Sequence, residues 1–437
     1  MKYNKVFVYF LIFTATFGSV VPGWSIEVGT AKTDITPPDS IYLWGYGNRT
    51  LPSEGTIDPL MAKVVVFDDG VKKAAIITVD LGRTFPEKEL KQLQNELKER
   101  YGLVQTLITA SHTHAAPGYG NDPVNQKWLK DILPQLVEMV GRAVQQTKNA
   151  IFKTATGSAD LSYDRRVIKD DGSVEMLWSN FERLMIRPVD QKVRAIFIND
   201  SEGKPIVTLV HYACHPVMTG QENLKVSADF PAYMSEVIED QIGGMSMFVQ
   251  GAAGNINPYM AAIVSADREN GIAIMKAEGV SLGNTVVALK TQARKVKTDS
   301  LMIRYSSIEN HFEARYDWED DRTQNIVKNL YLENPEEKII HANVSILTLG
   351  DQFAWAGFPG EFFDEFQQDL VARSPIPHTY FVGYCNGHFT YFPTIEAAAQ
   401  GGYGADIWTL PQIGAGEAMV DASIISLYRI SEKIEGK

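Results

Sequence analysis

Short apolar runs rich in β-branched residues alternate with longer amphipathic stretches along the chain, and this alternation constrains the fold more than any other feature. The runs 63–67 (KVVVF), 74–80 (AAIITVD) and 104–110 (VQTLITA) have the length and composition of buried strands. The charged segment 88–101 and the segment 129–147 have helical periodicity. Strands that alternate with helices predict an α/β domain whose helices cover a buried sheet.

The remaining apolar segments extend this pattern without dividing the chain. Further strand-like runs occupy residues 206–213, 245–252 and 344–350, and further helices are expected at 265–289 and after Pro359. We see no low-complexity linker and no internal repeat in the sequence. We therefore expect one large domain with a mixed sheet, flanking helices and an active site at the carboxyl ends of the strands.

The amino-terminal segment 1–24 has the layout of a secretory signal peptide. Lys2 and Lys5 precede an apolar stretch at residues 6–17, and small residues follow it. A membrane-spanning helix needs about 20 apolar residues, so this stretch is short for an uncleaved anchor, which is the alternative. We expect cleavage, a mature chain of residues 25–437, no stable membrane span, and a secreted or periplasmic location.

The composition limits the partners and the kind of site. The chain has 41 Lys and Arg against 53 Asp and Glu, a formal net charge of −12, and it shows no basic stripe that would bind nucleic acid. Two cysteines, Cys214 and Cys385, exclude a disulfide scaffold and a cysteine-rich metal site, but the sequence does not show whether they pair. It does not indicate an oligomeric state either.

Four histidines lie where strands are predicted to end. His112 and His114 stand two residues apart in ITASHTHAAPG, a spacing that points both imidazoles to one face of a strand. His211 and His215 lie in LVHYACHPVMTG. Neutral imidazole is the commonest protein ligand of a metal. His215, at the strand exit, is the better metal candidate of the second pair, and His211 is expected to be a hydrogen-bonded core residue. Elsewhere, His388 stays uncertain.

Carboxylates also stand at predicted strand exits. Glu361, in GFPGEF, is expected to open a helix, where the backbone dipole favours an acid, or to project from the carboxyl edge of the sheet. Asp80 and Asp229 have the same ambiguity. A catalytic zinc site needs about three or four nitrogen or oxygen ligands and one open position. Histidines and one carboxylate dispersed over several strand exits would satisfy that requirement.

Five segments, in order, resemble the catalytic domain of the neutral/alkaline non-lysosomal ceramidases. They are AKTDITPP with LWGYG (31–47), ITASHTHAAPG, HYACHPVMTG, GFPGEF and TYFPTIEAAAQGGYGAD. The resemblance covers essentially all of residues 25–437 and is specific as a set. It implies a zinc site with four ligands, namely His112, His215, Glu361 and Tyr391. It further implies that His114 faces the substrate carbonyl and that Tyr403 helps to stabilise the oxyanion. An arginine is expected to contact the substrate, namely Arg165, with Arg166 as the competing candidate.

Two departures from the family pattern bear on specificity. The family's catalytic serine is replaced by Asn257 in the segment 254–259. An amide cannot act as a nucleophile, although it can donate a hydrogen bond to an oxyanion. The family's carboxyl-terminal β-sandwich domain is expected to be absent.

The resemblance and the residues together predict an exported zinc-dependent hydrolase that cleaves an N-acyl amide bond with metal-activated water. The expected partner is a small-molecule or lipid substrate similar to ceramide, which would place the protein in sphingolipid metabolism. One alternative is a zinc hydrolase or lyase that acts on a carbohydrate or another polar conjugate. Another alternative is a lipid-binding relative without catalytic activity.

Overall fold

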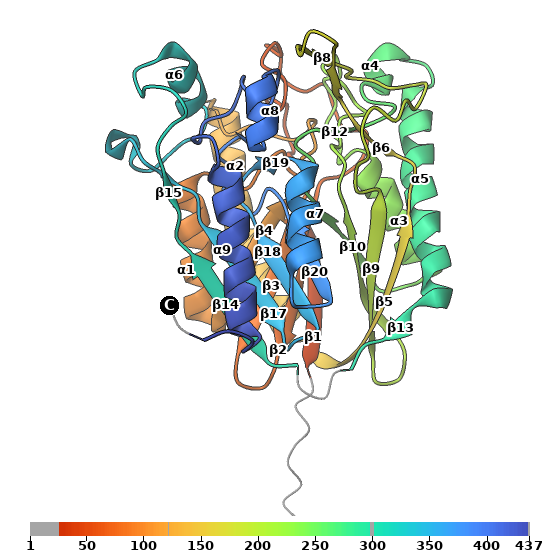
Figure 1. Cartoon of the computed structure of the whole chain (residues 1–437). Helices are drawn as coiled ribbons and strands as arrows, with labels where there is room; N and C mark the ends of the chain where they lie inside the picture. Colours follow the sequence, from red (N-terminus) through yellow and green to blue (C-terminus); the bar gives the residue numbers. More distant parts are fainter. Residues whose placement is uncertain (1–25, 121, 298–300, 436–437) are drawn as a thin grey trace, which may run out of the picture.

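Three four-stranded units with the same connectivity surround a common core (Figure 1). The computed structural model describes residues 26–120, 122–297 and 301–435, so the predicted signal peptide lies outside the described residues. In each unit, three antiparallel strands are followed by a helix, a fourth strand parallel to the third, and a second helix.

The bounds of the three units follow the order of the chain. The first has β1 (Glu27–Asp34), β2 (Met61–Asp68), β3 (Lys73–Val79), α1 (Glu87–Tyr101), β4 (Leu103–Ala110) and α2 (Pro123–Val144). The second has β5 (Lys148–Ser158), β9 (Lys192–Asp200), β10 (Pro205–Tyr212), α3 (Phe230–Gln241), β11 (Met245–Gln250) and α5 (Gly271–Leu289). The third has β14 (Ile303–Ile308), β17 (Val344–Leu349), β18 (Phe353–Gly357), α7 (Asp364–Arg373), β20 (His378–Val382) and α9 (Ala415–Ile430).

The first two units join at a short antiparallel contact between β1 and β5, with β13 (Arg294–Lys295) added beside β5. Short ladders near the site pair β6 (Ser162–Asp164) with β12 (Ile256–Pro258), β7 (Arg166–Ile168) with β8 (Val174–Met176), and β19 (Glu361–Phe362) with β21 (Tyr391–Phe392). Remaining short elements are η1 (Lys290–Gln292), α4 (Ile263–Ala266), β15 (His311–Phe312), α6 (Asp321–Val327), η2 (Pro335–Glu337), β16 (Ile340–His341) and α8 (Ile395–Gln400).

Aromatic side chains from all three units fill the space between the sheets. Phe67 stacks on Trp355 with ring centroids 5.5 Å apart, and Trp355 stacks on Phe353 at 5.7 Å. Phe152 packs against both phenylalanines, and all four side chains are buried. Helix pairs cover the outer faces, so β2, β3 and β17 are buried on both sides, as their continuous β-branched runs predict.

The predicted fold class is confirmed, because the chain forms a single mixed α/β domain with helices around the sheet. Two helix starts were predicted wrongly. The segment 129–147 belongs to α2, which begins at Pro123 because Asp122 caps it by accepting from the backbone N–H of Val124 at 2.9 Å. The segment 265–289 becomes helical as α5 only from Gly271. The repeat of connectivity was not visible in the sequence.

Within the described part of the chain, the stretch Gly271–Gln292 is the single helical segment that length and composition would allow to span a membrane. Two of its glycines lie against α3: a Cβ at Gly279 would come within 2.4 Å of the Phe230 carbonyl oxygen, and one at Gly283 within 2.9 Å of the Met234 carbonyl oxygen. The helix is therefore an integral, closely packed part of the second unit. Cys214 and Cys385 are both buried and free, so they do not pair.

Candidate metal centre

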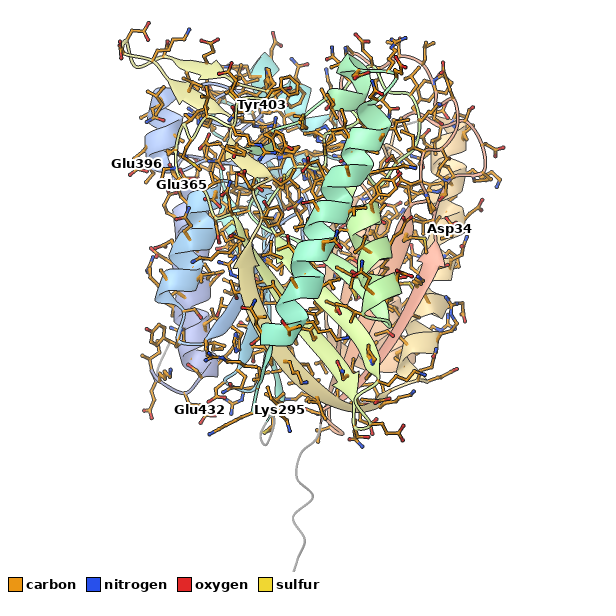
Figure 2. All side chains as sticks on the ribbon, turned by 90° about the vertical axis from the view of Figure 1, so that its right-hand side faces the viewer. Asp34, Lys295, Glu365, Glu396, Tyr403 and Glu432 are labelled. Atoms are coloured by element: carbon orange, nitrogen blue, oxygen red, sulfur yellow. The ribbon has the colours of Figure 1, made fainter. Side chains whose placement is uncertain are left out.

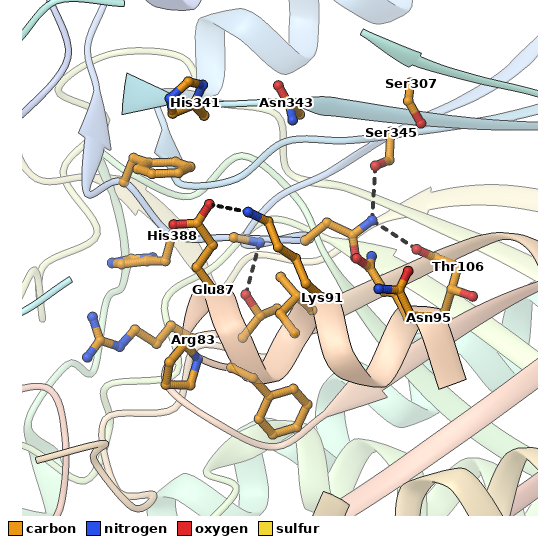
Figure 3. Close-up of a pocket in the computed structure, with 18 of the residues that line it drawn as sticks. Arg83, Glu87, Lys91, Asn95, Thr106, Ser307, His341, Asn343, Ser345 and His388 are labelled. Atoms are coloured by element: carbon orange, nitrogen blue, oxygen red, sulfur yellow. Dashed lines mark hydrogen bonds and ion pairs between the residues drawn. The ribbon is translucent and has the colours of Figure 1, made fainter. Parts of the chain in front are cut away.

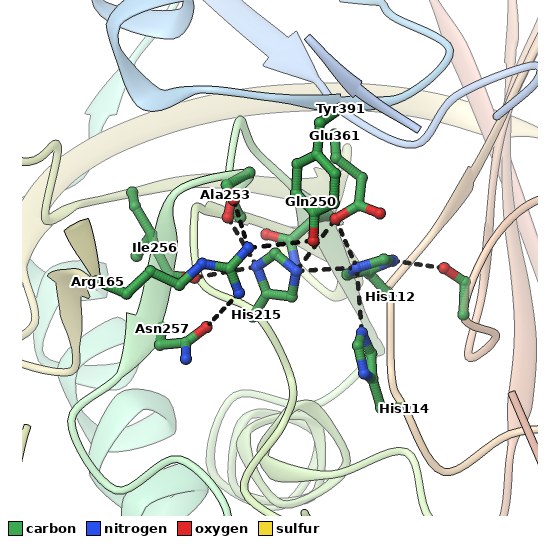
Figure 4. Close-up of polar contacts among 12 residues, drawn as sticks. His112, His114, Arg165, His215, Gln250, Ala253, Ile256, Asn257, Glu361 and Tyr391 are labelled. Carbon is green, nitrogen blue, oxygen red and sulfur yellow. Dashed lines mark hydrogen bonds and ion pairs between the residues drawn. The ribbon is translucent and has the colours of Figure 1, made fainter. Parts of the chain in front are cut away.

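Side chains from all three units converge at the carboxyl ends of the parallel strand pairs (Figure 4). His112 and His114 follow β4 of the first unit, and His215 follows β10 of the second. Glu361 follows β18 of the third. This is the edge at which the sequence predicted the active site.

Two buried imidazoles face each other, with the Nε2 atoms of His112 and His215 only 3.0 Å apart. Nδ1 of His112 lies 2.5 Å from the Gly82 carbonyl oxygen, and Nδ1 of His215 lies 2.7 Å and 3.0 Å from the carbonyl oxygens of Ala253 and Ile256. Because a carbonyl oxygen only accepts, each Nδ1 carries the proton in the neutral ring. Both Nε2 atoms therefore present lone pairs toward the same point.

Glu361 adds a third acceptor to this point. Its Oε2 lies 3.2 Å from His112 Nε2 and 3.3 Å from His215 Nε2, and it receives no hydrogen bond from the described residues. Burial lowers the pKa of His215 to about 4, which keeps that ring neutral.

Three acceptors without a shared proton repel one another unless a cation lies between them. Ligands at 2.0–2.1 Å in a tetrahedral zinc site lie about 3.4 Å from each other. The observed separations of 3.0, 3.2 and 3.3 Å are close to this spacing. The residues present therefore fit a metal ion.

His114 brings a third imidazole to the group. Its Nε2 lies 3.3 Å from His112 Nε2, and the ligand atoms of His112, His114 and His215 all lie within 4.8 Å of one another. Burial and the two neighbouring imidazoles lower the pKa of His114 well below its usual value. The ring is held edge-on by Trp44 at 4.9 Å and Tyr46 at 5.0 Å. These three histidines could hold a metal ion.

The histidines converge for a different reason from the one predicted. They were expected to share a strand face, but β4 ends at Ala110 and both lie in the loop beyond it. His112 has a φ of 73°, a left-handed conformation that is uncommon outside glycine. Its backbone N–H donates to the Leu81 carbonyl at 2.9 Å, which fixes the turn.

Glu361 does not open a helix as expected. It lies in β19, directly opposite Tyr391 of β21, and α7 begins three residues later at Asp364. The Glu361 N–H donates to the Thr390 carbonyl at 2.8 Å, so its backbone pairs with a strand rather than entering a helical turn. This parallel pairing places Glu361 and Tyr391 side by side.

Arg165 is the arginine that enters the site. Its buried guanidinium donates to Asn257 Oδ1 at 3.1 Å, to the Tyr391 hydroxyl at 3.1 Å and to the Gly254 carbonyl at 2.7 Å. The competing Arg166 lies within 3.4 Å of the Ala397 carbonyl instead. The amide nitrogen of Asn257 donates to the Trp178 carbonyl at 2.8 Å, so both ends of that amide are engaged.

Tyr403 stands at the outer edge of the site. Its ring centroid lies 5.6 Å from that of Tyr391 and 5.1 Å from that of Trp178. Burial raises the pKa of Tyr403, so its hydroxyl keeps its proton and remains a hydrogen-bond donor.

Three other residues at strand exits are engaged elsewhere. Asp80 accepts from the Met61 N–H at 3.0 Å, and Asp229 accepts from the Phe230 N–H at 2.8 Å at the start of α3. Nε2 of His211 lies 2.7 Å from the Phe381 carbonyl oxygen in the core.

Two residues that shape the centre were not identified from the sequence. His388 is buried, and its Nε2 lies 3.7 Å from Glu361 Oε1. Gln250 ends β11 and donates to the Ser111 carbonyl at 2.9 Å and the Cys214 carbonyl at 2.7 Å, which ties the two histidine loops together. A polar residue at the end of a buried strand was the available signal for Gln250.

His388 also lines a cavity of about 270 Å³ between α1 and the third unit (Figure 3). Polar groups of Glu87, Lys91 and Asn386 line this cavity. The Asn386 amide donates to the Ser345 hydroxyl at 3.0 Å, which anchors the loop that carries His388.

Comparisons with known proteins agree with this architecture. "Neutral ceramidase B" of Dictyostelium discoideum is 24% identical over 255 residues, which are 54% of this chain and 34% of that protein. "Neutral ceramidase" of Drosophila pseudoobscura pseudoobscura is 23% identical over 230 residues, 49% of this chain and 32% of that protein. The matched part thus spans about a third of these curated relatives.

Solved structures share the fold over nearly the whole chain. A crystal structure of neutral ceramidase from Pseudomonas aeruginosa has a TM-score of 0.74 and 16% sequence identity, covering 95% of this chain and 76% of that one. A ceramidase complexed with C2 has a TM-score of 0.73 and the same 16% identity and coverage. Residues 26–270 match the family model described as neutral/alkaline non-lysosomal ceramidase, N-terminal. Since this match covers more than half of its residues, the chain belongs to the neutral/alkaline non-lysosomal ceramidase family.

Proposed function

We propose that this protein is a zinc-dependent hydrolase that cleaves the N-acyl amide bond of a ceramide-like substrate. One observation carries the proposal: three buried atoms that can bind a metal, on His112, His215 and Glu361, lie within 3.3 Å of one another. Membership of the ceramidase family supports amide hydrolysis as the reaction.

The donor set favours zinc over a hard cation, because imidazole nitrogens suit zinc whereas calcium and magnesium prefer oxygen ligands. His112, His215 and Glu361 would hold the ion, and Tyr391, the strand neighbour of Glu361, would be the fourth ligand. When bound, the ion supplies Lewis-acid activation of water for attack on a carbonyl carbon.

The chain's own groups would orient the substrate and stabilise charge. Tyr403 would donate its hydroxyl proton in a hydrogen bond to the developing oxyanion; removing such a donor typically costs about 3–4 kcal/mol of transition-state stabilisation. Arg165 would hold the Tyr391 hydroxyl in place at 3.1 Å. His114, beside His112, would pass a proton to the leaving amine.

Asn257 would act as a positioning residue for Arg165 rather than as a direct participant. Its Oδ1 accepts from Arg165 and its amide nitrogen donates to the Trp178 carbonyl. Hydrolysis by activated water requires no serine nucleophile at this position.

The proposal includes export from the cytoplasm with removal of residues 1–24. The basic start and short apolar stretch of that segment support it. Amino-terminal sequencing of the protein recovered outside the cytoplasm should show a start near residue 25, and an intact Met1 in that fraction would contradict cleavage.

The test of the metal site combines metal analysis with turnover. The purified protein should contain one zinc per chain and hydrolyse a fluorescent N-acylsphingosine. Glu361→Gln should lose both properties, whereas His341→Ala, which removes a partly exposed imidazole hydrogen-bonded to Glu337, should keep both.

Two results would count against the proposal. Stoichiometric zinc in both His112→Ala and Glu361→Gln would refute the ligand assignment. Turnover of glycan conjugates with none of N-acylsphingosine would refute the amide substrate and favour the carbohydrate alternative.

A further inference from the structure

His114 is held in the metal centre differently from the other two histidines. The Nδ1 atoms of His112 and His215 each bind a main-chain carbonyl, which fixes the orientation of their rings. Nδ1 of His114 is buried and has no hydrogen-bond partner among the described residues. Its Nε2 lies 3.3 Å from Nε2 of His112, whose lone pair the metal would take up. The ring of His114 must therefore be oriented mainly by the groups that pack around it.

The groups that pack around this ring come from one short segment, residues 44–46. The rings of Trp44 and Tyr46 lie edge-on to His114, with centroids at 4.9 Å and 5.0 Å. Between them, a Cβ at Gly45 would come within 2.7 Å of Nδ1 of His114, and Gly45 has a φ of 109°, which favours glycine. The backbone of the segment is thus in close contact with the imidazole, and a displacement of the segment would release the ring.

Arg49 joins this segment to the loops that carry the histidines. Its guanidinium donates to the carbonyl of Trp44 at 3.0 Å and to the carbonyl of His114 itself. It also donates to the carbonyls of Gly220 at 2.7 Å and Gln221 at 3.0 Å, in the loop that follows β10. One side chain therefore connects three parts of the chain: its own segment, the loop after β4 and the loop after β10.

No anionic partner accounts for the position of Arg49. Every hydrogen bond that its guanidinium makes within the described part of the chain goes to a main-chain carbonyl. Burial lowers the pKa of Arg49 to about 10, so the group is charged at neutral pH and its loss of hydration opposes folding. Its guanidinium carbon lies 4.6 Å from the centre of the Tyr46 ring, the ring that packs on His114. The contacts of Arg49 thus converge on the surroundings of one imidazole.

We propose that Arg49 is a positioning residue that orients the imidazole of His114 beside the metal. It acts directly through the His114 carbonyl and indirectly through Trp44 and Tyr46, whose rings hold the imidazole. A guanidinium suits this task because its planar fork of five N–H donors can bond several carbonyls at once in fixed directions. The proposal rests on the proposed function only for the proton that His114 would pass, since the orientation of the ring requires no turnover.

The first experiment compares the histidine ring signals of isotope-labelled, zinc-loaded wild type and Arg49→Met by 1H–15N NMR. His114→Ala assigns the His114 signals by their loss. In Arg49→Met these signals should shift or broaden more than those of His112 and His215, whose Nδ1 bonds to carbonyls remain. Unchanged His114 signals in Arg49→Met would overturn the proposal.

The matched control is Arg304→Met. Arg304 is also partly buried, donates to the Ile430 carbonyl and pairs with Glu432 at 2.8 Å. Figure 2 shows Glu432 at the other end of the molecule from Tyr403. This variant should leave all histidine signals in place. Both arginine variants should keep one zinc per chain, because neither removes a ligand.

Turnover of a fluorescent N-acylsphingosine separates positioning from a general loss of stability. Arg49→Met should lower kcat about 100-fold with little change in KM, because a misplacement of about 1 Å can cost that much. The double variant with His114→Ala should be no slower than His114→Ala alone, since both changes remove the same contribution. Effects that multiply in the double variant would overturn the proposal.

Two further measurements keep the test decisive. Thermal unfolding checks the fold, and Arg49→Lys, which keeps the charge without the planar fork, carries the same comparisons if Arg49→Met does not fold. Displaced His114 signals in a protein that hydrolyses no N-acyl lipid would refute the proposed function and leave the positioning role of Arg49 standing.

Discussion

Gly254 should control the metal centre although it contributes no ligand. It lies between the segment that carries Glu361 and the guanidinium of Arg165, which donates to its carbonyl at 2.7 Å. Its N–H donates to the Phe362 carbonyl at 2.8 Å. A Cβ at this position would stand 2.4 Å from the Glu361 carbonyl oxygen and 2.8 Å from that of Phe362.

The magnitude of the disturbance follows from these distances. Carbon and oxygen atoms rarely approach closer than about 3.3 Å, so Gly254→Ala should push the Glu361 backbone away by about 1 Å. Metal sites require ligand distances within about 0.2 Å, so the displaced carboxylate should lower zinc affinity roughly 10- to 100-fold. Overpacking should also cost about 1–3 kcal/mol of stability.

The assay is zinc affinity by competition with a chromophoric chelator, accompanied by thermal unfolding. Gly47→Ala is the matched control, since a Cβ there meets nothing within 4 Å and its backbone is not in the left-handed region. The control should match the wild type in both measurements. Wild-type zinc affinity in Gly254→Ala would refute the idea that Gly254 sets the position of Glu361.

Three further substitutions test other parts of the structure. His388→Phe removes the contact with Glu361 Oε1 at 3.7 Å and should lower zinc affinity about tenfold in the same competition assay, with His388→Gln less affected. Arg165→Met should lower kcat about 100-fold or more with little change in KM, because Tyr391 loses its donor, and an unchanged kcat would contradict this role. Burial raises the pKa of Asp364 from 3.8 to about 7, so its ionisation opposes folding and stability should fall as pH rises from about 4 through 7. Asp364→Asn should remove that decline and be more stable at pH 8 by up to ~4 kcal/mol in urea unfolding, whereas parallel pH profiles would exclude a strained carboxyl.

The sequence predicts best those strands in which nearly every consecutive residue is buried. The strand β2 is buried at six consecutive positions, and its apolar run is visible without any knowledge of its partners. The strand β5 has only two buried residues, Ala150 and Phe152, among exposed and partly buried ones such as Lys153 and Thr154, and it was not predicted. It is a strand because it pairs with β9 along nine residues, a contact between distant parts of the chain that local composition does not encode.

The metal centre shows the same division. His112, His215 and Glu361 could be picked out because each follows a buried strand, and ligands bind where such strands end. His388 has an equivalent place after β20, but five residues separate it from the strand end, and only the fold brings it to Glu361. The conformation of His112 was equally hidden, since nothing in the sequence distinguishes a left-handed histidine from a strand residue.

The repeated connectivity explains why the centre lies where it does. Each unit ends its third and fourth strands at the same edge, so three units around one core bring six strand ends together. The groups proposed for the metal and substrate follow the ends of β4, β10, β18 and β20. The other two strand ends support them: Gln250, at the end of β11, hydrogen-bonds to the loop of His112, and the carbonyl of Gly82, after β3, orients the His112 ring. No single unit holds more than a part of the acceptor set. The centre therefore depends on how the units are packed, and a substitution in one unit, such as Gly254→Ala, should act on ligands carried by another.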